Sequence, residues 1–198
     1  MPTTGNAKTV RADARRNRQR LLEVAFRAFS SGAEPVTLEA IAKEAGVGIG
    51  TLYRHFPTRE SLVEAVYRGG LARLRENAEE LLASRAPDVA LRTWMDGFAD
   101  YVAAKQGMAE TLRAVIASGA IASAETRTVL TGTIGGLLGA GAAAGTIRDD
   151  VDADDVLASL TGILLAAGAP DQREQAGRML DLLVDGLRAR SAVPRQAG

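Results

Sequence analysis

Residues 37–66 read TLEAIAKEAGVGIGTLYRHFPTRESLVEAV, and this stretch decides the fold. Its first residue, Thr37, is a good N-cap for a helix. Gly46 stands where a left-handed turn would end that helix, since glycine adopts positive φ without strain. Between them, apolar residues recur at the spacing of one helical face: Leu38, Ile41, Ala42 and Ala45.

A second, shorter helix is predicted over residues 49–56. Pro57 ends it, and Thr58 caps a longer helix that follows. Two short helices joined by a turn of three or four residues containing glycine are typical of a helix-turn-helix motif. Gly50 weakens the second helix by about 1 kcal/mol relative to alanine, so we expect this glycine to serve close approach to a partner.

The second helix has two unlike faces when its residues are placed 100° apart. Leu52 and Phe56 point toward the core, with Ile49 close by. Arg54 lies on the opposite side, where an arginine can pair bidentately with guanine in the major groove of DNA. Taken singly, its polar residues also fit an ordinary solvated surface, but the joint pattern predicts DNA binding. That outer face and its edges comprise Gly50, Thr51, Tyr53, Arg54 and His55.

Composition and charge restrict the class of protein. The 198 residues are 46% hydrophobic and only 4% aromatic, which favours helices packed through small residues. There is no cysteine and one histidine, so thiolate and multi-histidine metal sites are excluded. Residues 1–75 hold 13 Lys and Arg against 7 Asp and Glu, whereas residues 76–198 hold 11 against 17. The basic front third suggests an anionic partner for that part of the chain.

The remaining apolar pattern predicts an all-α protein, because no alternating strand pattern occurs. A fourth helix runs from Arg59 to about Ala83, with Gly69-Gly70 as a possible bend in its middle. The expected organisation is an N-terminal helix-turn-helix domain followed by a C-terminal helical domain. In residue numbers, we expect a disordered arm (1–10), the DNA-binding domain (11–57), a connecting helix (58–83), the C-terminal domain (84–190) and a disordered tail (191–198).

The stretch 37–66 resembles the DNA-binding region of the TetR family of bacterial transcriptional regulators, and the resemblance extends over about residues 15–68. It implies a homodimer of all-helical subunits that binds double-stranded DNA at a palindromic operator. Each subunit would have an N-terminal three-helix helix-turn-helix domain and a C-terminal helical ligand-binding and dimerisation domain. By position, it implies phosphate contacts from Thr37, Tyr53, His55 and Arg59. It implies base or close-backbone contacts from Ile49, Gly50, Thr51 and Arg54. Ile49 departs from the polar residue that many relatives carry. The rest of the chain resembles the family in layout, and residues 92–112 look loosely like an actinobacterial subgroup.

Such regulators are typically released from DNA by a small molecule, here a small apolar or amphipathic ligand that the sequence does not identify. We expect its pocket among the middle helices, opposite the glycine-rich helix at Thr131–Gly145. The alternative is that the same side chains simply fill the core. The candidate lining residues are Trp94, Phe98, Tyr101, Met108, Leu112 and Ile116.

The last two helices, at about 152–167 and 171–190, are predicted to form the dimer interface. They are apolar around more of their circumference than one subunit can cover, so they would meet their symmetry mates in a four-helix bundle. A dimer also supplies a second copy of the helix at residues 49–56, so that each copy can bind one half of a palindromic site.

Other classes of protein are weighed against this reading. No cofactor, catalytic group or metal site is expected, because no nucleophile–base pair or carboxylate pair is recognisable. The uncharged residues 128–147 could span a bilayer in length, but six glycines among them gain little from lipid, so we expect a cytoplasmic protein without a membrane partner. An activator, or a DNA-binding regulator without a small-molecule ligand, remains open.

Overall fold

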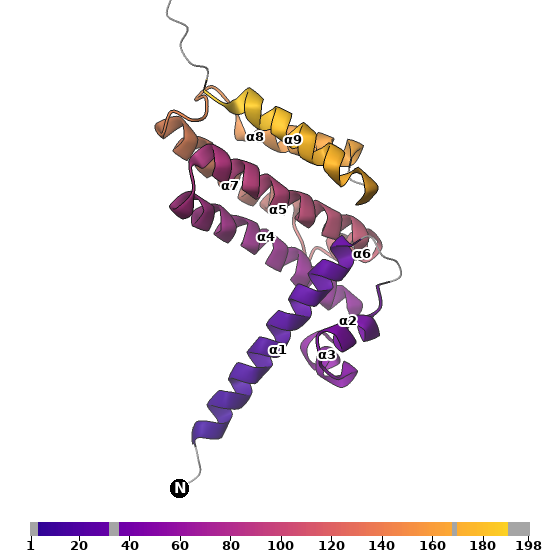
Figure 1. Ribbon diagram of the computed structural model, residues 1–198. Coiled ribbons are helices and arrows are strands. Elements are labelled where there is room, and N and C mark those ends of the chain that lie inside the picture. Colours follow the sequence, from indigo (N-terminus) through magenta and orange to yellow (C-terminus); the bar gives the residue numbers. More distant parts are fainter. Residues whose placement is uncertain (1–3, 32–35, 168–169, 190–198) are drawn as a thin grey trace, which may run out of the picture. The chain divides into compact units, whose positions relative to one another are not determined.

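The computed structural model describes residues 4–31, 36–167 and 170–189 (Figure 1). Over these residues the fold is all-α, as predicted. In chain order the elements are α1 (Thr4–Ser30), α2 (Leu38–Glu44), α3 (Ile49–His55), α4 (Arg59–Ser84), α5 (Pro87–Gly107), α6 (Ala109–Ala117), α7 (Ser123–Ala143), α8 (Ala153–Ala166), the 3-10 turn η1 (Pro170–Gln172) and α9 (Arg173–Leu187).

The chain forms two compact units. Unit 1 comprises Met1–Gly70 and Asp100–Ser123, and unit 2 comprises Leu71–Ala99 and Ala124–Gly198. The helices α4 and α5 therefore each give one part to unit 1 and the other part to unit 2. The sequence-based division, in contrast, placed residues 84–190 in the C-terminal domain and ended the DNA-binding domain at residue 57.

The helix α1 begins at Thr4, within the segment for which the sequence suggested a disordered arm. Extending an existing helix costs far less than nucleating a new one, so the well-packed C-terminal half of α1 supports the turns before it. In Figure 1 these first turns run on past α2 and α3 of the same unit. Residues 1–3 of the expected arm and the expected tail 191–198 lie outside the described residues.

Local signals place the helix ends of unit 1. The N–H of Ala40 donates to Thr37 Oγ1 at 3.1 Å, and Gly46 has a φ of 68°, as the cap and the turn require. At the start of α4, the Thr58 N–H donates to Ser61 Oγ while the Ser61 N–H donates to Thr58 Oγ1, both at 3.1 Å. This reciprocal pair satisfies two backbone donors that the first turn leaves free.

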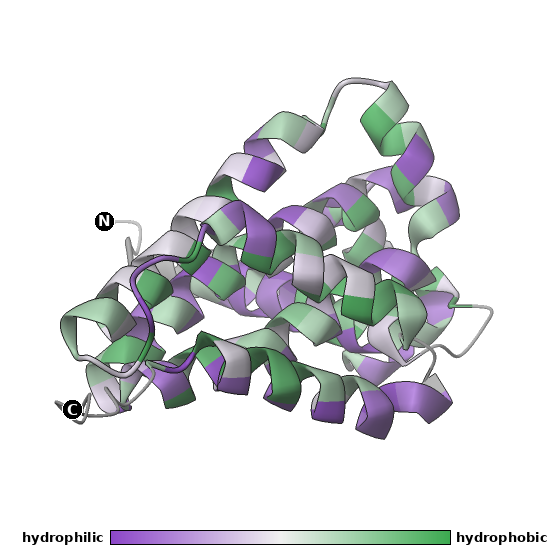
Figure 2. Cartoon of the chain, turned by 90° about the horizontal axis from the view of Figure 1, so that it is seen from above, coloured by the Kyte–Doolittle hydropathy of each residue, from purple (hydrophilic) through white to green (hydrophobic). Residues whose placement is uncertain are grey.

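Each unit has its own apolar core. Figure 2 shows hydrophobic residues in green and hydrophilic residues in purple alternating around the helices, the pattern of amphipathic helices that bury one face. In the part of the chain that the structure describes, no helix is long and apolar enough to cross a membrane. The largest fully buried side chains of unit 1 are Leu21, Phe29, Ile41, Leu52, Phe56 and Leu62, and those of unit 2 are Leu91, Trp94, Met95, Ile134, Leu137 and Leu160.

In unit 2, polar contacts of Arg92 link α5 to the last helix. Arg92 Nε donates to Asp181 Oδ1 of α9 at 2.5 Å, and Arg92 Nη1 donates to Asp96 Oδ1 at 2.6 Å. Figure 1 shows α8 and α9 side by side. The Arg92 contacts hold α9 on α5, and α8 packs beside α9.

Candidate DNA-binding interface

The turn between α2 and α3 is a Schellman-type C-cap. The Val47 N–H donates to the carbonyl oxygen of Ala42 at 3.0 Å, and the Gly46 N–H donates to that of Lys43 at 3.1 Å. The positive φ of Gly46 makes this geometry possible, since a side chain there would be strained. The turn thus fixes the direction in which α3 leaves α2.

The helix α3 is held by its inner face. Leu52 is fully buried and Phe56, which ends the helix, is 2% exposed. On the outer side, Gly50 and Arg54 are exposed, Tyr53 is 42% exposed, and Thr51 and His55 are half-buried. The burial pattern of α3 therefore matches the two faces derived from the sequence, apart from Ile49.

Packing within the protein does not require a glycine at position 50. A Cβ built on Gly50 would meet no atom within 4 Å, and its backbone does not need positive φ. Glycine weakens a helix relative to alanine, so the fold alone gives no reason for glycine here. A partner that approaches the backbone of α3 closely does give one.

Ile49 lies elsewhere than the helical wheel suggested. The wheel placed it near the core, but its side chain is 38% exposed. Ile49 is the first residue of α3, where no preceding turn covers the side chain. It is therefore an apolar group presented on the same surface as Tyr53.

Arg59 is oriented into unit 1 rather than toward solvent. Its Nη1 donates to the carbonyl oxygen of Val36 at 2.7 Å, and its Nε donates to Thr111 Oγ1 of α6 at 3.3 Å. The guanidinium carbon also lies 5.7 Å from the centre of the Phe29 ring. A side-chain contact from Arg59 to phosphate would require these interactions to break, whereas Thr37 remains exposed beside its cap.

The six candidate pocket residues do not form one group. Trp94 and Phe98 are stacked in unit 2, with ring centres 5.6 Å apart. Tyr101, Met108 and Leu112 are buried in unit 1, and Ile116 there is half-buried. The ring centres of Tyr101 and Tyr67 are 5.7 Å apart. Burial is the main cause that raises the pKa of the Tyr101 hydroxyl, and a hydrogen bond with Tyr67 raises it further.

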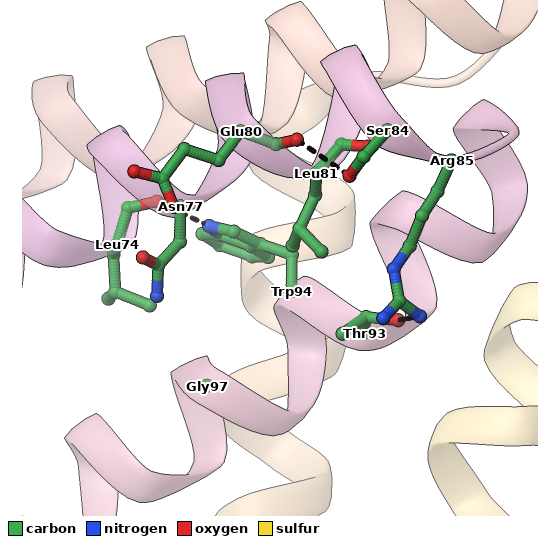
Figure 3. A pocket seen from close by; sticks show the side chains of 9 residues that line it. All are labelled: Leu74, Asn77, Glu80, Leu81, Ser84, Arg85, Thr93, Trp94 and Gly97. Atoms are coloured by element: carbon green, nitrogen blue, oxygen red, sulfur yellow. Dashed lines mark hydrogen bonds between the residues drawn. The ribbon is translucent and has the colours of Figure 1, made fainter.

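Unit 2 contains a cavity of about 300 Å³ between α4 and α5. Of the six candidates it includes Trp94 alone, whose indole Nε1 donates to the carbonyl oxygen of Leu74 at 2.8 Å (Figure 3). Figure 3 also shows the Ser84 hydroxyl directed to Glu80 and the Arg85 guanidinium directed to Thr93. The cavity is lined by Leu74, Asn77, Glu80, Leu81, Ser84, Arg85, Thr93, Trp94 and Gly97.

Unit 1 contains a second, larger cavity of about 610 Å³. Thr37, Tyr53 and Arg59 from the helix-turn-helix region line it together with Met108, the one pocket candidate it includes. The polar residues that line the cavity in unit 2, such as Asn77, Glu80 and Arg85, were missed in the sequence. They lie on α4 or directly after it, and the apolar pattern of α4 and α5 does not show which polar side chains of one helix face the other.

The acidic residues before α8 serve as cap and ion-pair partners. Asp152 Oδ1 accepts from the Asp154 N–H at 2.8 Å, and Asp154 in turn pairs with Arg127. Among the residues that the structure describes, no three His, Cys, Asp or Glu side chains gather as metal ligands would.

Comparisons with protein families match both parts of the chain. A family model described as bacterial regulatory proteins, tetR family, matches residues 21–66. A second model, described as transcriptional regulator SbtR-like, C-terminal domain, matches residues 86–189. Together the two models cover the helix-turn-helix motif and most of the chain that follows it.

Individual proteins similar to this chain are also transcriptional regulators. An HTH-type transcriptional regulator from Staphylococcus aureus (strain USA300) is 48% identical over 54 residues, which is 27% of this chain and 29% of that protein. The chain thus spans 29% of the length of this curated relative. The crystal structure of TetR transcriptional regulator SCO0520 from Streptomyces coelicolor is similar over 88% of this chain and 99% of its own, with 49% identity and a TM-score of 0.81. A TetR transcription regulatory protein from Mycobacterium vanbaalenii shares 36% identity over 90% of this chain and 99% of its own, with a TM-score of 0.69.

Proposed function

The chain belongs to the TetR family of bacterial transcriptional regulators, and we propose that it is a repressor that a small molecule releases from its operator. Members of this family bind DNA and form dimers. The observation that carries the proposal for this chain is the outer face of α3, where an exposed arginine stands beside a glycine that the fold does not need.

In this proposal α3 enters the major groove. Arg54 pairs with a guanine edge, and Gly50 and Thr51 bring the backbone near the bases. Ile49, exposed at the start of α3, contacts the methyl group of a thymine. Tyr53, His55 and Thr37 bind phosphates on either side of the groove, since base contacts specify the site and phosphate contacts position the protein.

Arg59 has a different role from the one implied by its position. Because its guanidinium is engaged by Val36 and Thr111, we assign the phosphate contact at the start of α4 to the backbone N–H groups of the first turn. The side chain holds the chain segment before α2 and the helix α6 together, which positions both Thr37 and the helix-turn-helix motif.

We propose that α8 and α9 form the dimer interface. Leu165 of α8 is 73% exposed and Leu182 of α9 is 72% exposed, the two most exposed large apolar side chains among the described residues. Two copies of such a helix pair can cover each other in a four-helix bundle. The twofold axis would present two α3 helices to the halves of a palindrome, one helical turn of DNA or a multiple apart.

The ligand is proposed to be small and amphipathic and to bind beside Trp94. The cavity of about 300 Å³ in unit 2 combines the indole ring with polar groups of Asn77, Glu80 and Arg85, and ligand sites typically combine an apolar wall with a few polar groups. A regulator without a ligand is the second candidate. It is favoured by the burial of Phe98, Tyr101 and Leu112, which leaves these three side chains 2–3% exposed.

Selection of bound duplexes from random DNA tests the function directly. The proposal expects enrichment of one palindrome, a preference for it over random DNA that falls as salt rises, and loss of that preference in Arg54→Ala. The same operator in a reporter strain distinguishes a repressor from an activator. Because the chain has a single tryptophan, fluorescence of Trp94 then reports which compounds bind next to it.

A further inference from the structure

The function proposed above assigns no ligand to the larger cavity, that of about 610 Å³ in unit 1. The start of α2 and the first turn of α6 both line this cavity, and its volume is typical of sites for small molecules. Met108 in its lining is buried, and Arg59 and Thr111 are half-buried, so these three residues form its deeper part.

Arg59 in this cavity is a half-buried cation without a carboxylate partner. Its guanidinium donates to the carbonyl oxygen of Val36 and to Thr111 Oγ1, which are both uncharged acceptors. In the part of the chain that the structure describes, no Asp or Glu forms an ion pair with it. A guanidinium has five N–H donors, and these two bonds leave three of them for a ligand. Because charges that are removed from water are normally paired, an anionic group of a ligand would complement Arg59.

Exposed charges of both signs line the same cavity without pairing with each other. They are Glu39 at the start of α2 and Glu110 and Arg113 of α6, and none of the three forms an ion pair with a described residue. Glu110 and Arg113 are three residues apart, a spacing at which ion pairs often form along a helix. With Arg59, the lining therefore contains two acidic and two basic residues, whose charges sum to zero.

We propose that this cavity binds a small zwitterion, a molecule that carries one carboxylate and one ammonium group. The carboxylate accepts hydrogen bonds from Arg59 and Arg113, and the ammonium donates to Glu39 and Glu110. Such charge-assisted hydrogen bonds are stronger than neutral ones. A ligand with only one of the two charges would leave one pair of side chains without a partner and would face their like charge.

The body of the ligand is expected to be apolar. Val36, Leu38 and Met108 give the cavity an apolar wall between its charged groups, and burial of apolar surface against this wall favours binding. The guanidinium of Arg59 is also held in place, since it lies 5.7 Å from the centre of the Phe29 ring in addition to its two hydrogen bonds. A group that is already ordered loses little entropy when the ligand binds.

The site overlaps the surface that we propose for DNA. Thr37 and Tyr53 line the cavity and are also two of the proposed phosphate contacts. A bound zwitterion would compete with phosphate at these side chains and would lower the affinity for the operator. This consequence rests on the proposed function, whereas binding of the zwitterion itself does not.

The test uses ω-amino acids of graded length, from β-alanine to aminooctanoate, as probes in calorimetric titrations of the full chain. For the length that binds best, the carboxylate without the amine and the amine without the carboxylate are the matched compounds. The ω-amino acid should bind at least about tenfold more tightly than either of them, because each lacks one set of charge-assisted hydrogen bonds.

Variants at the exposed charges locate the site without disturbing Arg59. In Glu39→Gln/Glu110→Gln, the ω-amino acid should lose its advantage over the simple carboxylate. In Arg113→Gln, its affinity should fall by about fivefold or more. The matched controls Glu23→Gln/Glu60→Gln and Lys105→Gln change exposed charges of unit 1 outside the cavity and should bind it as wild type does.

The overlap with DNA is tested on the selected operator. At a concentration ten times its dissociation constant, the best ω-amino acid should weaken operator binding by wild type by about tenfold or more. Arg113→Gln should bind the operator as wild type does and should respond much less to the same concentration.

The opposite results separate the two proposals. The inference is overturned if none of the ω-amino acids binds, if the compounds with a single charge bind equally well, or if the control variants lose as much affinity. Binding in the cavity with unchanged operator affinity would support the site and rule out its competition with DNA. If no palindrome is selected from random DNA, the proposed function fails, and the calorimetric result still decides whether the site exists.

Discussion

The ring of Tyr101 lies directly against the backbone of Gly70, and a Cβ added to Gly70 would be 2.9 Å from Tyr101 Cδ2. The adjacent Gly69 has nothing within 4 Å of its Cβ position. The sequence suggested that the glycine pair marks a bend, but only Gly70 has a packing role, which is to admit an aromatic side chain from α5. The two glycines therefore respond differently to the same substitution.

We expect Gly69→Ala to raise the free energy of unfolding by about 0.5–1 kcal/mol, because alanine favours a helix and the site has room. Gly70→Ala should lower it by about 1–2 kcal/mol, since displacement of the Tyr101 ring costs more than the helix preference returns. Urea denaturation of the two single variants measures both values. Equal stabilisation by both substitutions would contradict the close packing of Gly70 and Tyr101.

Alanine substitutions at Arg54 and Arg59 should affect different properties. The first should weaken DNA binding, and the second should lower the stability of the protein. Arg54→Ala should weaken operator binding by about 1–3 kcal/mol per half-site and leave thermal unfolding unchanged, because Arg54 is exposed. Arg59→Ala should destabilise the protein by about 1.5–3 kcal/mol, because it leaves the Val36 carbonyl without its charged donor. Calorimetry and fluorescence anisotropy on the same samples check the pair. Arg59→Ala with full stability and weak DNA binding would restore a direct phosphate contact.

Ile49 should read a thymine methyl group. Replacing the contacted thymine with uracil removes one methyl and should reduce wild-type affinity by about fourfold, the effect of about 0.8 kcal/mol. In Ile49→Ala the thymine and uracil operators should bind equally well. Systematic uracil substitution across the selected operator finds the position, and an unchanged uracil effect in the variant would assign the methyl contact to another residue.

Leu165 and Leu182 should maintain the dimer. Leu165→Asp/Leu182→Asp would place carboxylates in an apolar interface, so the dimer dissociation constant should rise by about 100-fold or more. Analytical ultracentrifugation at micromolar concentration measures the change. Val89→Asp is the matched control, since Val89 is a 44% exposed apolar residue outside α8 and α9. A double variant that stays dimeric would place the interface elsewhere.

The elements set by neighbouring residues could be predicted from sequence. The cap at Thr37 and the turn at Gly46 depend on hydrogen bonds and dihedral angles within a few residues, so their signals are local. The two faces of α3 follow from periodicity, and the structure differs there only at Ile49. That residue is the first of its helix, and a wheel does not describe which part of the chain covers a first turn.

The features that depend on distant residues could not be predicted. Arg59 turns inward because Thr111, 52 residues later, offers an acceptor. Gly70 is needed because Tyr101 packs on it, and the sequence between them gives no sign of that contact. The cavity beside Trp94 takes Asn77 and Glu80 from another helix, so hydrophobic periodicity on α5 alone pointed to Phe98 and Tyr101 instead.

The close approach of α5 to α1 affects how this protein can be engineered. Gly107 abuts the backbone of Phe29, and a Cβ at Gly107 would overlap the Phe29 carbonyl oxygen. Ser30 Oγ also donates to the carbonyl oxygen of Asp100 at 3.3 Å. A fragment that stops at Gly70 would therefore lose structural partners of its own first helix. A chimera that joins this DNA-binding unit to the ligand-binding part of another regulator must include both Met1–Gly70 and Asp100–Ser123. Fusions with a single crossover should give unstable hybrids.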